Sequence, residues 1–370
     1  MTSARPQVRG IRLGSIKGAQ IVVQPSTLLM LVILAFIYSS SADGQITPHA
    51  FSLGMLLAVL LFVSVFIHEL AHAIAAWSFG RKVETIMLTL WGGVTSFDAR
   101  AITPKVVGVT ALAGPLANSG IALASWGVLQ TGVTSGLVEA VIRWLAFANV
   151  LLAVFNVLPG IPMDGGKVLQ AAVWAGTGDR LKATRVAGWF GRAIAIVVVV
   201  AMIGYPLTQG ERISLINVAF AFLIFTVIWP SASAAIRAVG TVERRQTASI
   251  GALMRRSVGV SYTVSVAEAL DSARHAGALD AVVLSADGQP AALASVRTMN
   301  RVPEEQRPHE GLISVSVPIL RGAVVAPTLE GDELIASLRE WYGKTESWVV
   351  ADEGTVVGVV ELQDVVDALQ

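Results

Sequence analysis

Apolar residues in this chain gather into six long runs, which polar and charged segments separate. The runs lie at about 22–41, 52–79, 106–129, 137–158, 188–205 and 213–230. Each is close to the roughly 20 residues that a helix needs to cross a hydrocarbon layer about 30 Å thick. The first run reads back through Ile21–Val23, and Pro25 suits the first turn of a helix. The pattern predicts an α-helical polytopic membrane protein with six transmembrane helices.

After Pro230 the pattern changes to short β-rich runs that alternate with amphipathic helical segments. The two halves of this tail look alike at a lag of about 66 residues, which indicates an internal duplication. The corresponding segments are helices at Val266–Ala276 and Asp332–Trp341, and strands at Ala281–Ser285 and Ser347–Ala351. We therefore expect a membrane domain at 1–246 and a soluble α/β module of two repeats at 247–370.

Composition supports this division. Hydrophobic residues make up 54% of the chain and charged residues only 14%, whereas soluble proteins carry about 25% charged residues. The net charge of +1 combines +9 over residues 1–246 with −8 over residues 247–370. No basic cluster exceeds Arg244-Arg245, so we expect no nucleic-acid partner. The chain has no cysteine, which excludes disulfides, thiolate metal sites and a cysteine nucleophile.

Lysine and arginine alternate between the loops. Segments 1–26, 80–105 and 167–192 hold four, four and five of them. The intervening loops hold only Arg212. By the positive-inside rule, the chain is a multi-pass protein of the cell membrane with both termini in the cytoplasm.

Between the second and third apolar runs, residues 84–97 are rich in strand formers and have Gly92-Gly93 in the middle. This pattern predicts a membrane-associated β-hairpin. Bare strand edges cannot face lipid, so we expect the hairpin to lie against protein or to line a water-filled cavity.

The second apolar run contains the sequence His68-Glu69-Leu70-Ala71-His72. On a helix, His68 and His72 lie on one face, so both imidazoles can bind one zinc ion. Glu69 lies beside them, where it can take a proton from a water molecule that the metal activates. Polar residues inside a membrane helix are costly and are functional by default. The alternative is a buried polar cluster that holds helices together.

A catalytic zinc site usually has three protein ligands, so a third must come from elsewhere in the chain. After the fourth run, Pro159 and Pro162 break the helix just before Asp164-Gly165-Gly166. Asp164 is expected to stand among apolar residues at membrane depth with no neighbouring base to pair it, and a metal would offset that cost. We therefore expect one Zn²⁺ per chain, held by His68, His72 and Asp164. The alternative is an Asp164 that merely caps the next helix.

Together these motifs resemble the site-2 protease family of intramembrane zinc metalloproteases. The resemblance rests on the His68–His72 helix, on Asn156 with the prolines and Asp164 that follow it, and on Gly114-Pro115-Leu-Ala-Asn118. It implies cleavage of a transmembrane helix near the cytoplasmic face, as in regulated intramembrane proteolysis. The partner would be a single-pass membrane protein, such as a membrane-bound anti-sigma or other regulatory factor.

The resemblance also implies roles for residues outside the metal ligands. Asn156 would hydrogen-bond the substrate or the developing oxyanion; a structural bond across the broken helix is the alternative. A substrate must unwind before cleavage, and the hairpin could hold it as an added strand, with Gly92, Gly93 and Val94 as the binding residues.

The duplicated tail resembles a pair of CBS (cystathionine-β-synthase-type) domains. Such pairs commonly bind adenine nucleotides, often through Thr/Ser-x-x-Asp at the end of each repeat. Here the first repeat has Ser295-Val-Arg-Thr298, which lacks the Asp, and the second has Glu361-Leu-Gln-Asp364, which lacks the hydroxyl. Because the tail is also strongly acidic, we expect docking or homodimerisation rather than nucleotide binding.

A competing hypothesis is a divalent-cation transporter or channel with CBS regulation. A transport path should place ionisable residues on several helices and show related halves, whereas here these residues cluster at one point. A third hypothesis, an inactive scaffold, should have lost Glu69. Zinc itself follows from the resemblance, because two His and one Asp also suit iron, cobalt or manganese.

Overall fold

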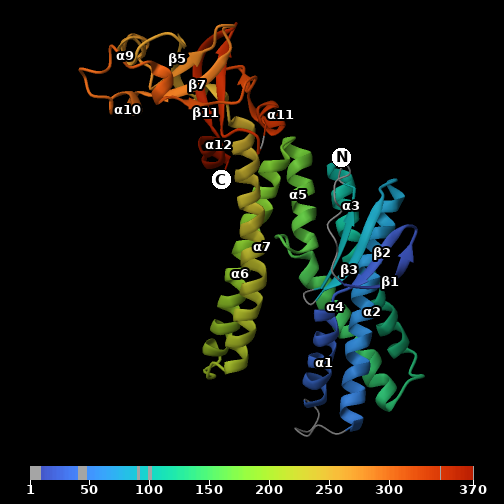
Figure 1. Ribbon diagram of the computed structural model, residues 1–370. Coiled ribbons are helices and arrows are strands. Elements are labelled where there is room, and N and C mark those ends of the chain that lie inside the picture. Colours follow the sequence, from blue (N-terminus) through green and yellow to red (C-terminus); the bar gives the residue numbers. More distant parts are fainter. Residues whose placement is uncertain (1–9, 41–47, 90–91, 99–101, 342, 370) are drawn as a thin grey trace. The chain divides into compact units, whose positions relative to one another are not determined.

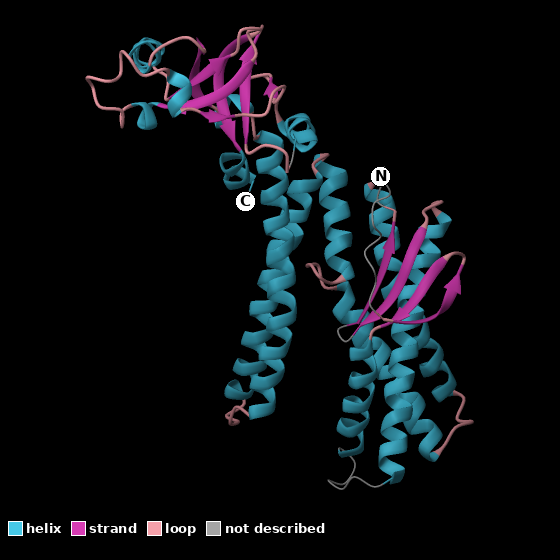
Figure 2. Cartoon of the chain, in the orientation of Figure 1, coloured by secondary structure: helices cyan, strands magenta, loops and turns pink. Residues whose placement is uncertain are grey.

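A computed structural model of the chain describes residues 10–40, 48–89, 92–98, 102–341 and 343–369. Its contacts divide the chain into two units, Met1–Arg237 and Ala238–Gln370 (Figure 1). The first unit contains the helices and a small sheet, and the second contains a larger sheet with short helices (Figure 2).

The first unit is built mainly from helices. They are α1 (Pro25–Ser40), α2 (Pro48–Ser78), α3 (Pro104–Gln130), α4 (Gly136–Val157), α5 (Asp164–Thr177), α6 (Arg180–Thr208) and α7 (Leu215–Thr247). Within the described residues, five are long and apolar enough to cross a membrane: α2, α3, α4, α6 and most of α7.

The prediction of six membrane-crossing helices therefore differs from the structure at α1. This helix has 16 residues and rises only about 24 Å. Residues Ile21–Val23, where the sequence pattern placed the start of this helix, belong instead to strand β2 (Ala19–Val23). An apolar run of β-branched residues suits a strand as well as a helix, and Pro25 marks the point where the helix begins.

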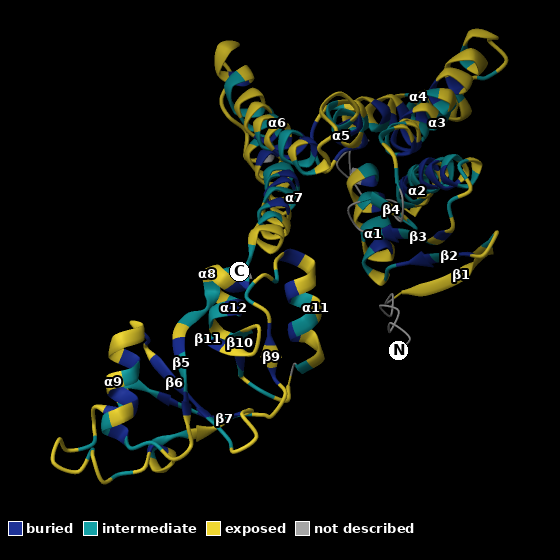
Figure 3. Cartoon of the chain, turned by 90° about the horizontal axis from the view of Figure 1, so that it is seen from above, coloured by how far each residue is buried: buried dark blue, intermediate teal, exposed yellow. Residues whose placement is uncertain are grey.

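A four-stranded sheet, in the order β1-β2-β3-β4, lies beside α2. Its other strands are β1 (Ile11–Ile16), β3 (Val83–Thr89) and β4 (Gly92–Phe97). Strands β3 and β4 pair antiparallel, as expected for residues 84–97, and β2 pairs parallel to β3. The sequence analysis missed β1 and β2. The buried face of β3 packs through Val83 and Ile86 against Ala73 and Ala76 of α2, whereas β1 is largely exposed (Figure 3).

Helix α7 continues to Thr247, well beyond Pro230, where the composition changes. The apolar run predicted from the sequence ends at 230, because charged residues become regular after Pro230. The residues after it are helix formers such as Ala and Arg, and the helix continues through them. The division at 246/247 remains a prediction, because α7 extends across the boundary between the two units.

The second unit contains a seven-stranded sheet in the order β8-β7-β6-β5-β11-β10-β9. Its strands are β5 (Arg255–Ser261), β6 (Asp280–Leu284), β7 (Pro290–Ser295), β8 (Val317–Pro318), β9 (Val324–Val325), β10 (Ser347–Asp352) and β11 (Thr355–Glu361). The helical segments are α8 (Ile250–Leu253), α9 (Val266–Ala276), α10 (Val296–Met299), η1 (Leu312–Val315), α11 (Gly331–Trp341) and α12 (Leu362–Leu369).

The expected duplication is visible in the strand order, because the order β7-β6-β5 of the first repeat recurs as β11-β10-β9 in the second, with the same antiparallel and parallel pairings. The four predicted elements of the repeats lie within one residue of α9, α11, β6 and β10. Each repeat has its own core. Leu312, which precedes the second repeat, packs in the first core, and Ile250, which precedes the first repeat, packs in the second. The two repeats therefore fold as one module.

Candidate metal centre

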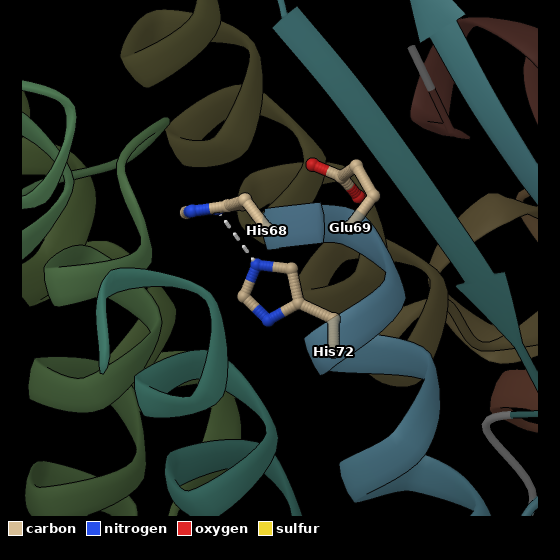
Figure 4. A group of neighbouring side chains, drawn as sticks. All are labelled: His68, Glu69 and His72. Atoms are coloured by element: carbon tan, nitrogen blue, oxygen red, sulfur yellow. Dashed lines mark hydrogen bonds between the residues drawn. The ribbon is translucent and has the colours of Figure 1, made fainter. Parts of the chain in front are cut away.

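His68 and His72 lie one turn apart on the same face of α2, as their spacing predicts. Both are buried, and their Nε2 atoms are 3.0 Å apart (Figure 4). Gly114 of α3 lies against this pair: a Cβ there would stand 2.5 Å from both Nε2 atoms. The glycine of the Gly114-Pro115 motif thus leaves room for the two imidazoles.

Asp164 joins the pair from a different part of the chain. It is the first residue of α5, and its Oδ2 lies 3.0 Å from Nε2 of His68 and 3.1 Å from Nε2 of His72. Gly165 permits this approach, because a Cβ at that position would come 2.1 Å from the carbonyl oxygen of Val157. The broken helix after α4 therefore serves to fold Asp164 back onto α2.

The hydrogen-bond partners of the two Nδ1 atoms indicate which ring nitrogen of each histidine carries the hydrogen. Nδ1 of His72 lies 2.7 Å from the carbonyl oxygen of Thr110, which can only accept a hydrogen bond. Nδ1 of His68 bonds to Oδ1 of Asn118, whose Nδ2 donates to Asn149. Both rings thus carry hydrogen on Nδ1 and direct the lone pair of Nε2 toward Asp164.

This arrangement fits a metal ion. Two Nε2 atoms 3.0 Å apart cannot both carry a hydrogen, and a cation among them and Asp164 Oδ2 satisfies all three atoms. Ligand atoms about 2.0–2.1 Å from a tetrahedral zinc lie roughly 3.3 Å from one another, close to the observed separations. The donor set of two imidazoles and one carboxylate is one that catalytic zinc sites use.

Asp164 has a basic neighbour, contrary to the sequence analysis. Nζ of Lys167 lies 3.0 Å from Oδ1 of Asp164, one turn along α5. The expectation of an unpaired carboxylate is wrong, because residues 164–167 form the first turn of a helix, on which positions i and i+3 are neighbours. Lys167 contacts the other carboxylate oxygen, so it orients Asp164 and leaves Oδ2 facing the histidines.

Glu69 lies beside the histidines and is also buried. Its Oε2 accepts a hydrogen bond of 2.7 Å from the hydroxyl of Thr95 in β4. The hairpin approaches so closely that a Cβ at Gly93 would stand 2.1 Å from Cγ of Glu69. The predicted hairpin therefore contacts the predicted proton acceptor, which the sequence did not indicate.

Among the described residues, no hydrogen bond joins the other predicted site residues to the histidines. Nδ2 of Asn156 donates to the carbonyl oxygen of Leu152 in its own helix, and among the described residues no hydrogen bond joins Asn156 to the ligands. Gly92 and Val94 lie in β4 with Gly93, and the side chain of Val94 is exposed.

Sequence analysis missed Asn149, Ser64 and Thr95. Asn149 is fully buried in the apolar helix α4, where it bonds to Asn118 and Ser64. An amide inside a membrane helix is itself a signal, since such residues are rare without a partner. That rule could have identified Asn149 but not the residue to which it bonds.

Part of the chain is similar to known peptidases. Residues 56–135 and 130–201 match Peptidase family M50. Rip3 of Mycobacterium tuberculosis, a protein named as a zinc metalloprotease, is 37% identical over 197 residues, which are 51% of this chain and 50% of Rip3. The chain thus spans about half the length of the curated relatives it matches.

Two solved structures are also similar. The site-2 protease from Methanocaldococcus jannaschii is 27% identical, with a TM-score of 0.45, and the match covers 61% of this chain and 94% of that one. The CBS domain of a bacterial CNNM/CorC family Mg²⁺ transporter is 18% identical, with a TM-score of 0.26, over 35% of this chain and 80% of that one. Residues 56–201, which hold all three candidate ligands and Glu69, are thus the part of the chain that is similar to peptidase family M50.

Proposed function

We propose that this chain is an intramembrane zinc endopeptidase that cleaves a transmembrane helix of a membrane-anchored protein. The observation that carries the proposal is the convergence of three buried lone pairs, from His68, His72 and Asp164, beside the carboxylate of Glu69. The similarity of residues 56–201 to peptidase family M50 supports the same reaction class. Nothing in the geometry of this group favours ion transport, the competing hypothesis.

Zinc held by these ligands would activate a water molecule and polarise the peptide carbonyl. Glu69 accepts the proton of that water and delivers it to the departing amine. Thr95 supports this role because its hydroxyl donates to Oε2, which orients the carboxylate and leaves Oε1 to receive the proton. Burial of the site keeps bulk water from competing with these contacts.

We further propose that the substrate binds as an added strand along β4. Among the described strands, β4 lies at the end of the sheet order, so one of its edges is available to a partner strand. A peptide on that edge, against Gly92, Gly93 and Val94, would lie next to Glu69, because Gly93 and Thr95 contact this residue. Unwinding the substrate helix exposes the peptide groups that such pairing requires.

Asn156 is proposed to donate to the substrate or to the oxyanion. Its Nδ2 carries two hydrogens, of which the bond to Leu152 uses one. An oxyanion donor of this kind typically contributes about 3 kcal/mol to the transition state.

The proposed setting is the cell membrane, with cytoplasmic termini, one zinc per chain and a single-pass membrane protein such as an anti-sigma factor as substrate. The C-terminal module is proposed to mediate docking or homodimerisation. The alternation of basic loops supports this orientation.

The test compares the purified protein with Glu69→Gln in detergent, using candidate single-pass membrane proteins as substrates. The amide has nearly the size of the carboxylate but cannot accept the proton. We expect Glu69→Gln to retain zinc and to lose cleavage. Activity of Glu69→Gln within tenfold of the unsubstituted protein would mean that another group is the base.

A further inference from the structure

A chain of hydrogen bonds leads from a backbone carbonyl in α4 to the first metal-ligand candidate. The Nδ2 of Asn149 donates to the carbonyl oxygen of Leu145, at 2.9 Å, and to Oγ of Ser64, at 3.0 Å. Its Oδ1 accepts from Nδ2 of Asn118 at 2.7 Å, and Oδ1 of Asn118 bonds to Nδ1 of His68. Asn118 and Asn149 are both fully buried, so water does not compete for these bonds.

The direction of every bond follows from the Leu145 carbonyl, which can only accept. It requires the NH₂ group of Asn149 on its side, which turns Oδ1 of Asn149 toward Asn118. Asn118 must then present its own NH₂ group to Asn149 and its oxygen to His68. The ring of His68 therefore has to donate from Nδ1, and Nε2 keeps a free lone pair.

We propose that this relay, from Leu145 through Asn149 and Asn118, fixes the tautomer of His68 that can bind a metal. Asn149 is then a positioning residue, although it touches neither ligand nor substrate. The inference rests on the proposed metal site. The same tautomer of His72 is fixed by one direct contact, because its Nδ1 faces the carbonyl oxygen of Thr110.

The relay matters because His68 has a second stable arrangement. If the Asn118 amide turned over, its NH₂ group would face Nδ1 of His68, and the ring hydrogen would move to Nε2. That hydrogen would point at Oδ2 of Asp164, 3.0 Å away, and form a good hydrogen bond. Such a state satisfies the buried groups without a metal, and Asn149 prevents it by holding Asn118 in one orientation.

Asn149→Leu removes the relay while keeping a side chain of similar size. Asn118 then loses its fixed partner and can turn over, so we expect zinc affinity to fall about 10- to 100-fold, the usual effect of losing such an outer contact. Ser64→Ala is the matched control. It removes another buried bond of Asn149, but the Leu145 carbonyl still fixes the amide, so zinc affinity should stay within about twofold.

The double variant that carries Asn149→Leu and Asn118→Asp tests the direction of the hydrogen bonds in the relay. A carboxylate can only accept, so it requires hydrogen on Nδ1 of His68 whatever lies behind it. We expect the double variant to recover most of the zinc affinity that Asn149→Leu loses. If Asn149 only filled space, Asn118→Asp would not restore the zinc affinity.

Both measurements use the full chain in detergent: zinc affinity by chelator competition, and the ¹⁵N shifts of the His68 ring in the zinc-free protein. The unsubstituted protein and Ser64→Ala should show hydrogen on Nδ1, and Asn149→Leu a mixture or hydrogen on Nε2. Hydrogen on Nε2 in the unsubstituted protein would overturn the relay, as would equal losses in Ser64→Ala and Asn149→Leu. An unsubstituted protein that bound no zinc while keeping hydrogen on Nδ1 would instead count against the proposed function.

Discussion

Gly114 is the residue on which the space for the metal centre depends most directly. A Cβ at this position would stand 2.5 Å from Nε2 of both His68 and His72, a distance that such atoms do not tolerate. Gly114→Ala should therefore displace the imidazoles and lower zinc affinity at least about tenfold. Gly120→Ala is the control on the same helix, because a Cβ there meets no atom within 4 Å. Full zinc content in Gly114→Ala after dialysis against a chelator would show that α3 can move away.

The ligands themselves are tested by His72→Ala. The site then retains His68 and Asp164, and a zinc site reduced to two protein ligands loses most of its affinity. Metal analysis should find well under one zinc per chain, against one for the unsubstituted protein. Full occupancy in His72→Ala would refute the assignment of this residue.

At the scale of residues, the sequence predicts what is local. The spacing of His68 and His72 determines their common face, and Glu69 lies beside them, because a helix repeats every 3.6 residues. The hydrogen-bond partners of the histidines come from α3 and, through Asn118, from α4. The arrangement of those helices depends on tertiary packing, so periodicity along the chain could not pair Asn149 with Asn118 or His72 with Thr110.

At the scale of elements, strand β4 connects the sheet to the site. If the substrate pairs with β4, then Val94→Pro should slow cleavage at least about tenfold, because proline cannot donate a ladder hydrogen bond and stiffens the strand. Val94→Thr is the control, since it keeps both the N–H group and the β-branched shape. Zinc content should not change in either variant, because β4 supplies no ligand. Equal cleavage rates for the two variants would argue against strand addition.

The same sheet shows the limit of predictions from hydrophobic runs. The hairpin at 84–97 could be predicted because Gly92-Gly93 divides it into two strand-forming halves. Strand β2 was not predicted, because Ile21–Val23 were assigned to the apolar run that forms most of helix α1. Strand β2 pairs with the adjacent β1 and with β3, about 65 residues along the chain, and the distant pairing is absent from a local pattern.

At the scale of the whole molecule, an ion cluster links the two repeats of the C-terminal module. Arg255 of β5 pairs with Glu361 of β11 and lies 3.3 Å from Asp280 of β6. Burial raises the pKa of Asp280, and Arg255 opposes that shift while Glu361 adds to it. Because the three residues come from three strands and both repeats, the cluster contributes to the fit between repeats.

Arg255→Leu should therefore lower the melting temperature of the module, since a buried carboxylate without its partner typically costs about 3–5 kcal/mol. The pKa of Asp280 should rise further, because the group that lowered it is gone. A raised carboxyl pKa favours the folded state as pH falls through it, so the loss should be larger at pH 8 than at pH 5. Arg256→Leu, on the exposed neighbouring residue, is the control. A pH-independent loss would show that packing of the arginine stem, rather than its charge, matters.

The module also bears on whether adenine nucleotides regulate the chain. A cavity of about 700 Å³ lies between the repeats, lined by Val317, Leu320, Lys344 and Leu362 among others. Of the residues at the positions that would hold a ribose, Glu361 is already paired with Arg255, and Ser295 caps helix α10 by accepting from Thr298. Both side chains thus already make contacts within the protein.

We expect ATP and AMP to bind the full chain no more tightly than about 0.1 mM, because both ribose positions are compromised and residues 247–370 carry a charge of −8, which repels phosphates. Titration calorimetry in detergent measures this, and zinc content should stay constant throughout, since every candidate ligand precedes residue 170. Removing residues 248–370, after the end of α7, should likewise retain zinc but change the cleavage rate or oligomeric state. A micromolar affinity for either nucleotide would mean that the cavity itself, without the ribose contacts, suffices for binding, and would make the module a sensor rather than a docking element.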